Sequence, residues 1–177
     1  TTALARDLVC VAAGMIIVST VSVEADISWG NFFLLGGVLA AAVAAPYLLS
    51  RFVFKDRAIR FAWRGGWPWS KIQWFYIVLV LFLGWLILPF YFITSGVYLN
   101  WLEVTEWHEI ARLFVGVNVV GTWDELFFIC TVFVLFLRHF PTWQANILQA
   151  IIFVSFLWEL GYQSWGPLLT IPFALLQ

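Results

Sequence analysis

Long apolar runs constrain this chain more than any other feature of its sequence. A helix needs about 20 consecutive, mostly apolar residues to cross the hydrocarbon core of a bilayer. Six runs of roughly this kind follow one another: Leu8–Val23, Trp29–Phe54, Trp74–Gly96, Phe114–Leu137, Gln144–Tyr162 and a last run that opens at Pro167 and is still apolar at Gln177. The sequence therefore predicts an all-α fold, a polytopic transmembrane helical bundle with about six spans.

The composition agrees with lipid as the main solvent of this chain. Hydrophobic residues make up 63% and charged residues only 11% of the 177 positions, whereas a soluble domain carries about 25% charged residues. The net charge of −1 gives no reason to expect a nucleic-acid partner. Without repeats or a long linker, residues 1–177 are predicted to form one membrane-embedded domain. We also expect no cleavable signal peptide, because the first apolar run lacks a small-residue cleavage site.

The distribution of basic residues predicts the orientation in the membrane. If the helices alternate in direction, eight of the nine basic residues fall on one side and only Arg112 on the other; the eight are Arg6, Arg51, Lys55, Arg57, Arg60, Arg64, Lys71 and Arg138. Basic residues concentrate in cytoplasmic loops. We therefore expect a cytoplasmic N-terminus, with the chain in a bacterial inner (plasma) membrane.

Two connectors between the runs have an amphipathic character. In the basic segment Lys55–Lys71, arginines recur at helical spacing beside Phe61 and Trp63, which predicts a short helix lying on lipid head groups. Alternatively, the basic residues of this segment only determine the orientation of the chain in the membrane. The acidic segment Asn100–Arg112 is interpreted as a connector of the same kind on the opposite side.

Three acidic residues stand inside the predicted spans: Asp124, Glu125 and Glu159. A charge at the centre of a membrane helix costs about 2.5–3.5 kcal/mol on insertion scales. We therefore expect these side chains to face the interior of the bundle. Ionisable residues at this depth are functional candidates by default.

Helical geometry predicts that two of these acids meet. Glu125 lies about 18 Å above the end of its span at Leu137, and Glu159 lies about 22 Å above Gln144. Each acid belongs to a polar stripe, formed by Asn118, Thr122 and Glu125 on one helix and by Ser155, Glu159 and Gln163 on the next. Three interpretations stay open: a hydrogen-bonded clasp between helices, a catalytic site for water, and a path for protons or ions.

Other chemical motifs are weak. His108-Glu109 resembles the start of a zinc-binding HExxH helix, but Arg112 stands where the second histidine belongs, so no metal site is expected there. The two cysteines, Cys10 and Cys130, lie in apolar runs and are expected to be free thiols. No cofactor is identified from these residues.

The C-terminal third resembles a known family of membrane proteins. The segments WDELFFICTVFVLFLRHFP, from Trp123, and IIFVSFLWELGYQSWGPLLTIPFALLQ, from Ile151, look like the core of the CAAX-protease and bacteriocin-processing family, over about residues 114–177. That family has a Glu-Glu pair followed after three residues by Arg, matched here by Asp124-Glu125 with Ile129 at the Arg position. Its Phe-x-x-x-His motif is matched by Ser155 to Glu159, with Glu in place of His. Its third motif would lie beyond Gln177.

This resemblance implies a helical bundle in which acidic residues activate water, with Glu125, Asp124 and Glu159 as the candidate catalytic residues. The missing Arg and His indicate a degenerate active site. The leading hypothesis is therefore an accessory or scaffold subunit, in contact with membrane lipids and other membrane-protein subunits. The many aromatic residues, 12 Trp and 18 Phe, offer broad surfaces for such contacts. The alternatives are an intramembrane endopeptidase acting on hydrophobic or prenylated peptides and a proton or ion conductor.

Overall fold

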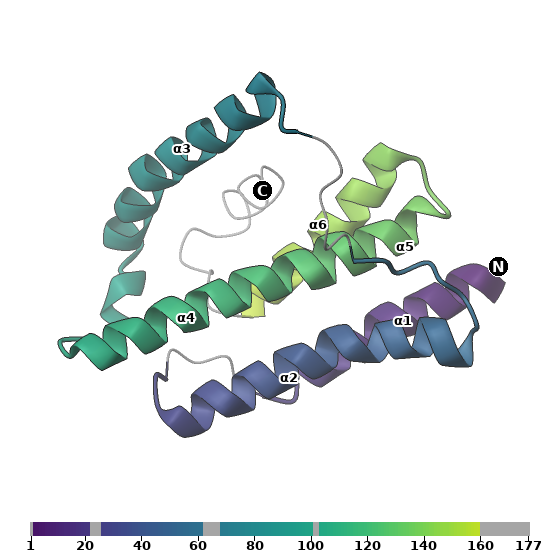
Figure 1. Ribbon diagram of the computed structural model, residues 1–177, viewed down its shortest axis with the longest axis horizontal. Coiled ribbons are helices and arrows are strands. Elements are labelled where there is room, and N and C mark those ends of the chain that lie inside the picture. The colour runs from purple at the N-terminus through teal and green to yellow at the C-terminus, as the bar shows by residue number, and fades with distance from the viewer. Residues whose placement is uncertain (1, 22–25, 62–67, 101–102, 160–177) are drawn as a thin grey trace. The chain divides into compact units, whose positions relative to one another are not determined.

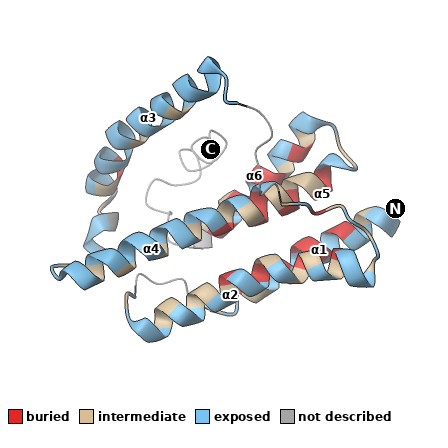
Figure 2. Cartoon of the chain, in the orientation of Figure 1, coloured by how far each residue is buried: buried red, intermediate tan, exposed pale blue. Residues whose placement is uncertain are grey.

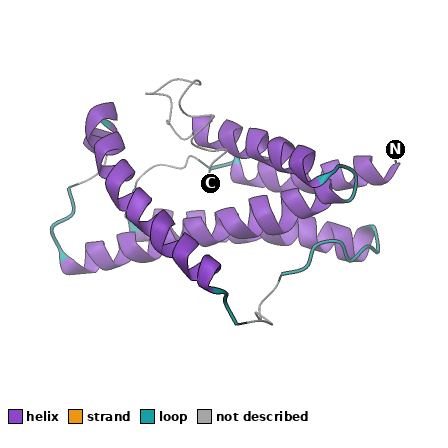
Figure 3. Cartoon of the chain, turned by 90° about the horizontal axis from the view of Figure 1, so that it is seen from above, coloured by secondary structure: helices purple, strands orange, loops and turns teal. Residues whose placement is uncertain are grey.

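The computed structural model of this protein describes residues 2–21, 26–61, 68–100 and 103–159, and all regular structure in these ranges is helical (Figures 1 and 3). The chain divides into two compact units. Unit 1 combines residues 1–61 with residues 103–177, and unit 2 comprises residues 62–102. Each unit is described by itself.

Unit 1 begins with a helical hairpin. α1 (Thr2–Val18) packs along α2 (Trp29–Leu48), which runs in the opposite direction (Figure 1). The Ser28 hydroxyl accepts a hydrogen bond from the Asn31 backbone N–H at 3.3 Å and so caps α2. Near the other end, Pro46 lacks an N–H for the ladder, and the helix continues as a π-helix, η1 (Leu49–Val53).

A second long helix crosses unit 1 parallel to α2. It consists of α4 (Trp107–Asp124), the π-helix η3 (Glu125–Phe133) and α5 (Val134–Leu137) without interruption. The Thr131 hydroxyl donates to the Leu126 carbonyl at 2.9 Å and so bonds a backbone group within the widened turns. α6 (Thr142–Glu159) then returns in the opposite direction and packs against η3 and α5 (Figure 1).

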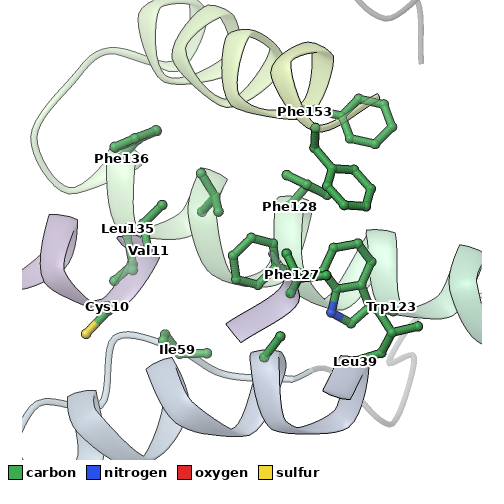
Figure 4. Packing of buried hydrophobic residues seen from close by; sticks show 14 of the residues in the cluster. Cys10, Val11, Leu39, Ile59, Trp123, Phe127, Phe128, Leu135, Phe136 and Phe153 are labelled. Carbon is green, nitrogen blue, oxygen red and sulfur yellow. The ribbon is translucent and has the colours of Figure 1, made fainter. Parts of the chain in front are cut away.

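The core of unit 1 lies where η3 meets α1, α2 and α6 (Figures 2 and 4). Phe127, Phe128 and Leu135 are fully buried there. Gly14 allows a close approach, because a Cβ at this position would collide with the Phe127 ring and lie 2.8 Å from the Ala42 carbonyl oxygen. The close packing of α1 against η3 thus depends on a glycine opposite an aromatic ring.

Unit 2 is described over residues 68–100 and consists of α3 (Lys71–Ser95) followed by the 3-10 helix η2 (Val97–Asn100). Ser70 and Gln73 form a capping box at its start, and Gly96 ends it with a φ of 71°, a conformation that favours glycine. The most apolar 18-residue window of α3 has a mean hydropathy of 2.5, and none of that window is buried inside the protein. The length and composition of α3 therefore suit a helix that crosses a membrane.

Three helices in the described ranges are long and apolar enough to cross a membrane: Trp29–Val53, Lys71–Thr94 and Trp107–Leu137. They correspond to the second, third and fourth predicted runs and indicate a membrane protein. The described part of the fifth run is a shorter apolar helix, Thr142–Leu157, and the first is the 17-residue α1. The sixth run, Pro167–Gln177, lies outside the described residues.

Two predictions about connectors need correction. Residues 55–61 form no helix, because Lys55 has a φ of 52° that ends η1 and Ile59 is drawn into the core with 3% exposure. Residues 62–67 of that connector lie outside the described chain. On the other side, residues from Trp107 onward belong to α4 and not to a separate connector. The resulting helix of 31 residues spans about 46 Å at 1.5 Å per residue, more than a hydrocarbon core requires.

Candidate functional site

The predicted acid pair lies where the long helix changes from α to π geometry. Asp124 is the last residue of α4 and Glu125 the first of η3. Short π segments inside helices are frequent at functional sites. Asp124 is half-buried, whereas Glu125 is exposed among the described residues and does not face the described interior of unit 1. The inward face of this turn is filled by Trp123 and Phe127, and Glu125 points elsewhere as a consequence.

The polar stripe that precedes Glu125 is also exposed. The Asn118 amide donates to the Phe114 carbonyl at 2.7 Å, and the Thr122 hydroxyl donates to the Asn118 carbonyl at 2.7 Å. Both side chains therefore bond to their own helix and to no neighbouring one in the described chain. Gly121 stands in the same surface with open space around it. The stripe is a polar, small-residue face directed away from the bundle.

Aromatic rings make the contact between the two C-terminal helices. The ring centroids of Phe128 and Phe153 lie 4.8 Å apart, and those of Trp123 and Phe156 lie 5.1 Å apart. The two helices are antiparallel neighbours. Their polar stripes do not form the contact in the described residues, because Ser155 is exposed and donates to the Ile151 carbonyl at 2.8 Å on its own helix.

Glu159 ends α6, but its side chain and Gln163 lie outside the described part of the structure. The predicted meeting of Glu159 with Glu125 therefore stays a prediction. Beside the acid pair, Asp124 Oδ1 and Trp123 Nε1 are buried without a hydrogen-bond partner among the described residues. One is an acceptor and the other a donor, so this turn presents two opposite hydrogen-bonding groups with remaining capacity.

A second cluster of charges was missed by the sequence reasoning. Asp7, on α1, is buried with 8% of its side chain exposed. Both of its carboxylate oxygens lie 3.1 Å from Arg138 Nη1, and Oδ2 lies 2.7 Å from His139 Nε2. His139 is therefore half-buried against a carboxylate. Such pairing is what a buried carboxylate requires.

Asp56 extends this cluster to the segment that follows η1. Its Oδ2 forms an ion pair with Arg138 Nη2 at 2.6 Å. Its backbone is held by Ser50, whose carbonyl accepts from the Asp56 N–H at 2.8 Å and whose hydroxyl donates to the Asp56 carbonyl at 3.3 Å. One guanidinium thus joins α1, the segment after η1 and the end of α5.

A cavity of about 130 Å³ lies beside these charges, with Arg6, Asp7, Asp56 and Arg138 in its wall. This cluster of charges could have been predicted from the sequence. Helix alternation already places these four residues on one side of the membrane, but only the basic ones were used, to assign orientation. Opposite charges grouped at the ends of neighbouring spans would have predicted the pairing.

Metal binding has no geometric support in the part of the chain that the structure describes, where no three His, Cys, Asp or Glu side chains are grouped as ligands. His108 is exposed at the start of α4, one end of the long helix, and His139 lies just beyond the other. Neither is near the acid pair, which stands about 18 Å above Leu137. The acid pair consequently lacks a described histidine partner.

Comparisons with known proteins add no assignment. A scan against protein-family models, a search of curated proteins and a search of solved structures each found no match. The function of this chain is therefore inferred from its geometry.

Proposed function

We propose that this chain is a six-span membrane protein with a degenerate CAAX-protease-like site, acting as an accessory or scaffold subunit of a larger membrane complex. The observation that carries the proposal is the exposed stripe of Asn118, Thr122 and Glu125 within an otherwise apolar span. In this reading the stripe is the surface on which another membrane helix packs.

The energetics of a polar group in lipid support a helix partner. An uncompensated charge at the centre of a membrane helix costs about 2.5–3.5 kcal/mol. A neighbouring helix that donates hydrogen bonds to Glu125 removes much of this penalty. Small residues let helix backbones approach closely in membranes, and Gly121 lies in the stripe with no neighbouring atom of the described chain within 4 Å of where its Cβ would be.

The directions of the helices in unit 1 support the proposed topology. α1 and α6 run one way, and α2 and the long helix from α4 to α5 run the other (Figure 1). With α3 as an intervening span, a sixth span after α6 and a cytoplasmic N-terminus, these directions alternate as the charge distribution requires. A bacterial plasma membrane is the proposed location.

The test compares two glycine substitutions in the full chain. Gly121→Leu blocks close approach on the stripe, whereas Gly37→Leu adds the same side chain on α2, where the surroundings are equally open. Each tagged protein is extracted from its native membrane in mild detergent, and the copurifying polypeptides are quantified by mass spectrometry. We expect a partner at fixed stoichiometry with the wild type and Gly37→Leu, and a loss of about tenfold with Gly121→Leu, equivalent to 1.4 kcal/mol.

Two outcomes would contradict the subunit proposal. One is a wild-type protein that purifies alone, and the other is a partner that both variants retain equally. In either case the exposed stripe does not bind a protein helix.

A second candidate is an intramembrane endopeptidase for hydrophobic or prenylated peptides. It is favoured by Asp124 Oδ1, which lies next to Glu125 and has no hydrogen-bond partner among the described residues, since the acid pair of such a site needs carboxylate oxygens that are free to accept a proton. The substitution Glu125→Gln keeps the shape and removes the base. If this candidate is correct, the variant inserts normally and loses processing of a hydrophobic peptide panel, and retained processing excludes it.

A further inference from the structure

The charged cavity at one end of unit 1 carries an inference that does not depend on the proposed subunit role. Its wall is built from the first turns of α1, from η1 with the segment after it, and from Arg138, which directly follows α5. Two apolar helices that are long enough to span a membrane end at this cavity. The helix Trp29–Val53 ends three residues before Asp56, and the helix Trp107–Leu137 ends next to Arg138. The cavity therefore lies at the level where spans end and lipid head groups begin.

The charges in the cavity differ in how much bonding capacity they have left. Asp7 is buried and accepts bonds from both Arg138 and His139. Arg138 forms ion pairs with both Asp7 and Asp56. Asp56, in contrast, forms a single ion pair and its side chain is 39% exposed, so further lone pairs of its carboxylate can accept hydrogen bonds.

Arg6 supplies the complementary charge. It forms no ion pair with any carboxylate of the described residues, and its guanidinium carbon lies 5.9 Å from the centroid of the Phe54 ring. That distance is near the outer limit of a cation–π contact and leaves the N–H groups available. The cavity thus presents one anionic acceptor, Asp56, and one cationic donor, Arg6, that are not fully used within the protein.

We propose that this cavity binds a phosphoethanolamine head group, with its primary ammonium at Asp56 and its phosphate at Arg6. A simple anion would face two carboxylates, and a simple cation would face two guanidiniums. A zwitterion satisfies both remaining groups at once. The cavity volume of about 130 Å³ is close to that of an engineered protein cavity that admits benzene, about 150 Å³, so the ammonium and its two-carbon stem fit.

The same chemistry predicts selectivity among lipids. The ammonium of phosphatidylethanolamine donates three N–H bonds, like that of a lysine side chain. The trimethylammonium of phosphatidylcholine has no N–H group to give to Asp56, and phosphatidylglycerol has no cation at all. Because charge-assisted hydrogen bonds are the stronger ones, the loss of this contact is expected to lower occupancy about tenfold.

The experiment measures lipid binding to the purified full chain by native mass spectrometry. The protein in detergent is mixed with equimolar phosphatidylethanolamine, phosphatidylcholine and phosphatidylglycerol that carry identical acyl chains. We expect phosphatidylethanolamine adducts to exceed the others about tenfold. Asp56→Asn should abolish this preference, because the amide lacks the charge that binds the ammonium. Arg6→Gln should lower the occupancy of all three lipids by a similar factor without unfolding the protein, since Arg6 holds no described ion pair and the phosphate is common to the three.

Arg57→Gln is the matched control, because Arg57 is exposed and does not line the cavity. Equal occupancy of the three lipids on the wild type would overturn the proposal, as would a preference that Asp56→Asn and Arg57→Gln change equally. A final arm adds glycerophosphoethanolamine, which has the same head group without acyl chains. Retention of the lipid at equal concentrations assigns the site to a membrane lipid, whereas displacement would overturn that assignment in favour of a soluble ligand.

Discussion

Two acidic regions of unit 1 differ in how their charges are accommodated. At one end, Asp7 is buried and bonded to Arg138 and His139, so its charge is neutralised within the protein. At mid-helix, Asp124 has an unpaired buried oxygen, and Glu125 is exposed in an apolar span. The first region uses charge to hold segments of the same chain together. The second leaves polar groups available to something outside it.

The difference follows from what each helix turn has as neighbours. Around Asp7, three chain segments converge and one of them brings a guanidinium. Around Glu125, the neighbouring helices are reached by Trp123 and Phe127, whose rings stack at 5.4 Å between centroids, and Glu125 itself is exposed among the described residues. An acidic residue in a membrane helix is therefore structural or available for function according to which face it occupies.

The largest expected effect comes from removing the buried carboxylate. Asp7→Ala should lower the free energy of unfolding by about 3 kcal/mol, the lower end for a broken buried ion pair, because Arg138 is 35% exposed and partly hydrated. Thermal and denaturant unfolding in detergent measure the change. Glu103→Ala, at an exposed position of the same unit, should stay within about 0.5 kcal/mol. Equal stability of both variants would show that the Asp7 pair contributes little.

A smaller change in stability is expected from adding a methyl group at two glycines. One, Gly14 on α1, packs against the inward face of the long helix, and the other, Gly121, lies on its outward face. Gly14→Ala puts a methyl group against the Phe127 ring and the Ala42 carbonyl, which should destabilise unit 1 by about 2 kcal/mol through overpacking. Gly121→Ala adds the same methyl group in open space on the polar stripe. It should raise stability by up to about 1 kcal/mol, since alanine favours helix. The two melting temperatures therefore shift in opposite directions, and a parallel shift would mean that the stripe is packed.

The smallest effect is expected at the exposed acid. Glu125→Leu should change the free energy of unfolding of the isolated protein by no more than about 0.5 kcal/mol, because Glu125 has no hydrogen bond in the described chain. Chemical unfolding of the purified variant in detergent tests this. A loss clearly above 1 kcal/mol would show that Glu125 bonds within the bundle after all, and would restore the interpretation of a polar clasp.

Much of the helical architecture could be predicted from the sequence alone. The run Trp29–Phe54 corresponds to the helix Trp29–Val53, and the run ending at Leu137 corresponds to a helix that ends there. The start of that helix was less accurate, since α4 begins at Trp107 and not at Phe114. Apolar length is a local property, whereas polar residues at a helix end are compatible with either a connector or a further turn.

The candidate site was predictable only in part. The acid pair was identified, because a carboxylate inside an apolar run is conspicuous in the sequence. Its outward orientation was not, because helix periodicity relates residues to one another and does not say which face meets the neighbours. The arginine spacing in residues 55–71 likewise predicted a helix, but the burial of Ile59 and the Asp56–Arg138 pair hold residues 55–61 in a non-helical path.

By itself, the sequence determined that this chain is helical and suited to a membrane, since about 20 apolar residues in a row satisfy both the backbone and the lipid within one segment. Only the tertiary structure decided which charges are paired. Asp7 and Arg138 are 131 positions apart, and their 3.1 Å contact depends on the convergence of α1, η1 and α5. Long-range pairing of this kind depends on how helices pack, and that depends on the shapes of rings such as Phe127 against Gly14.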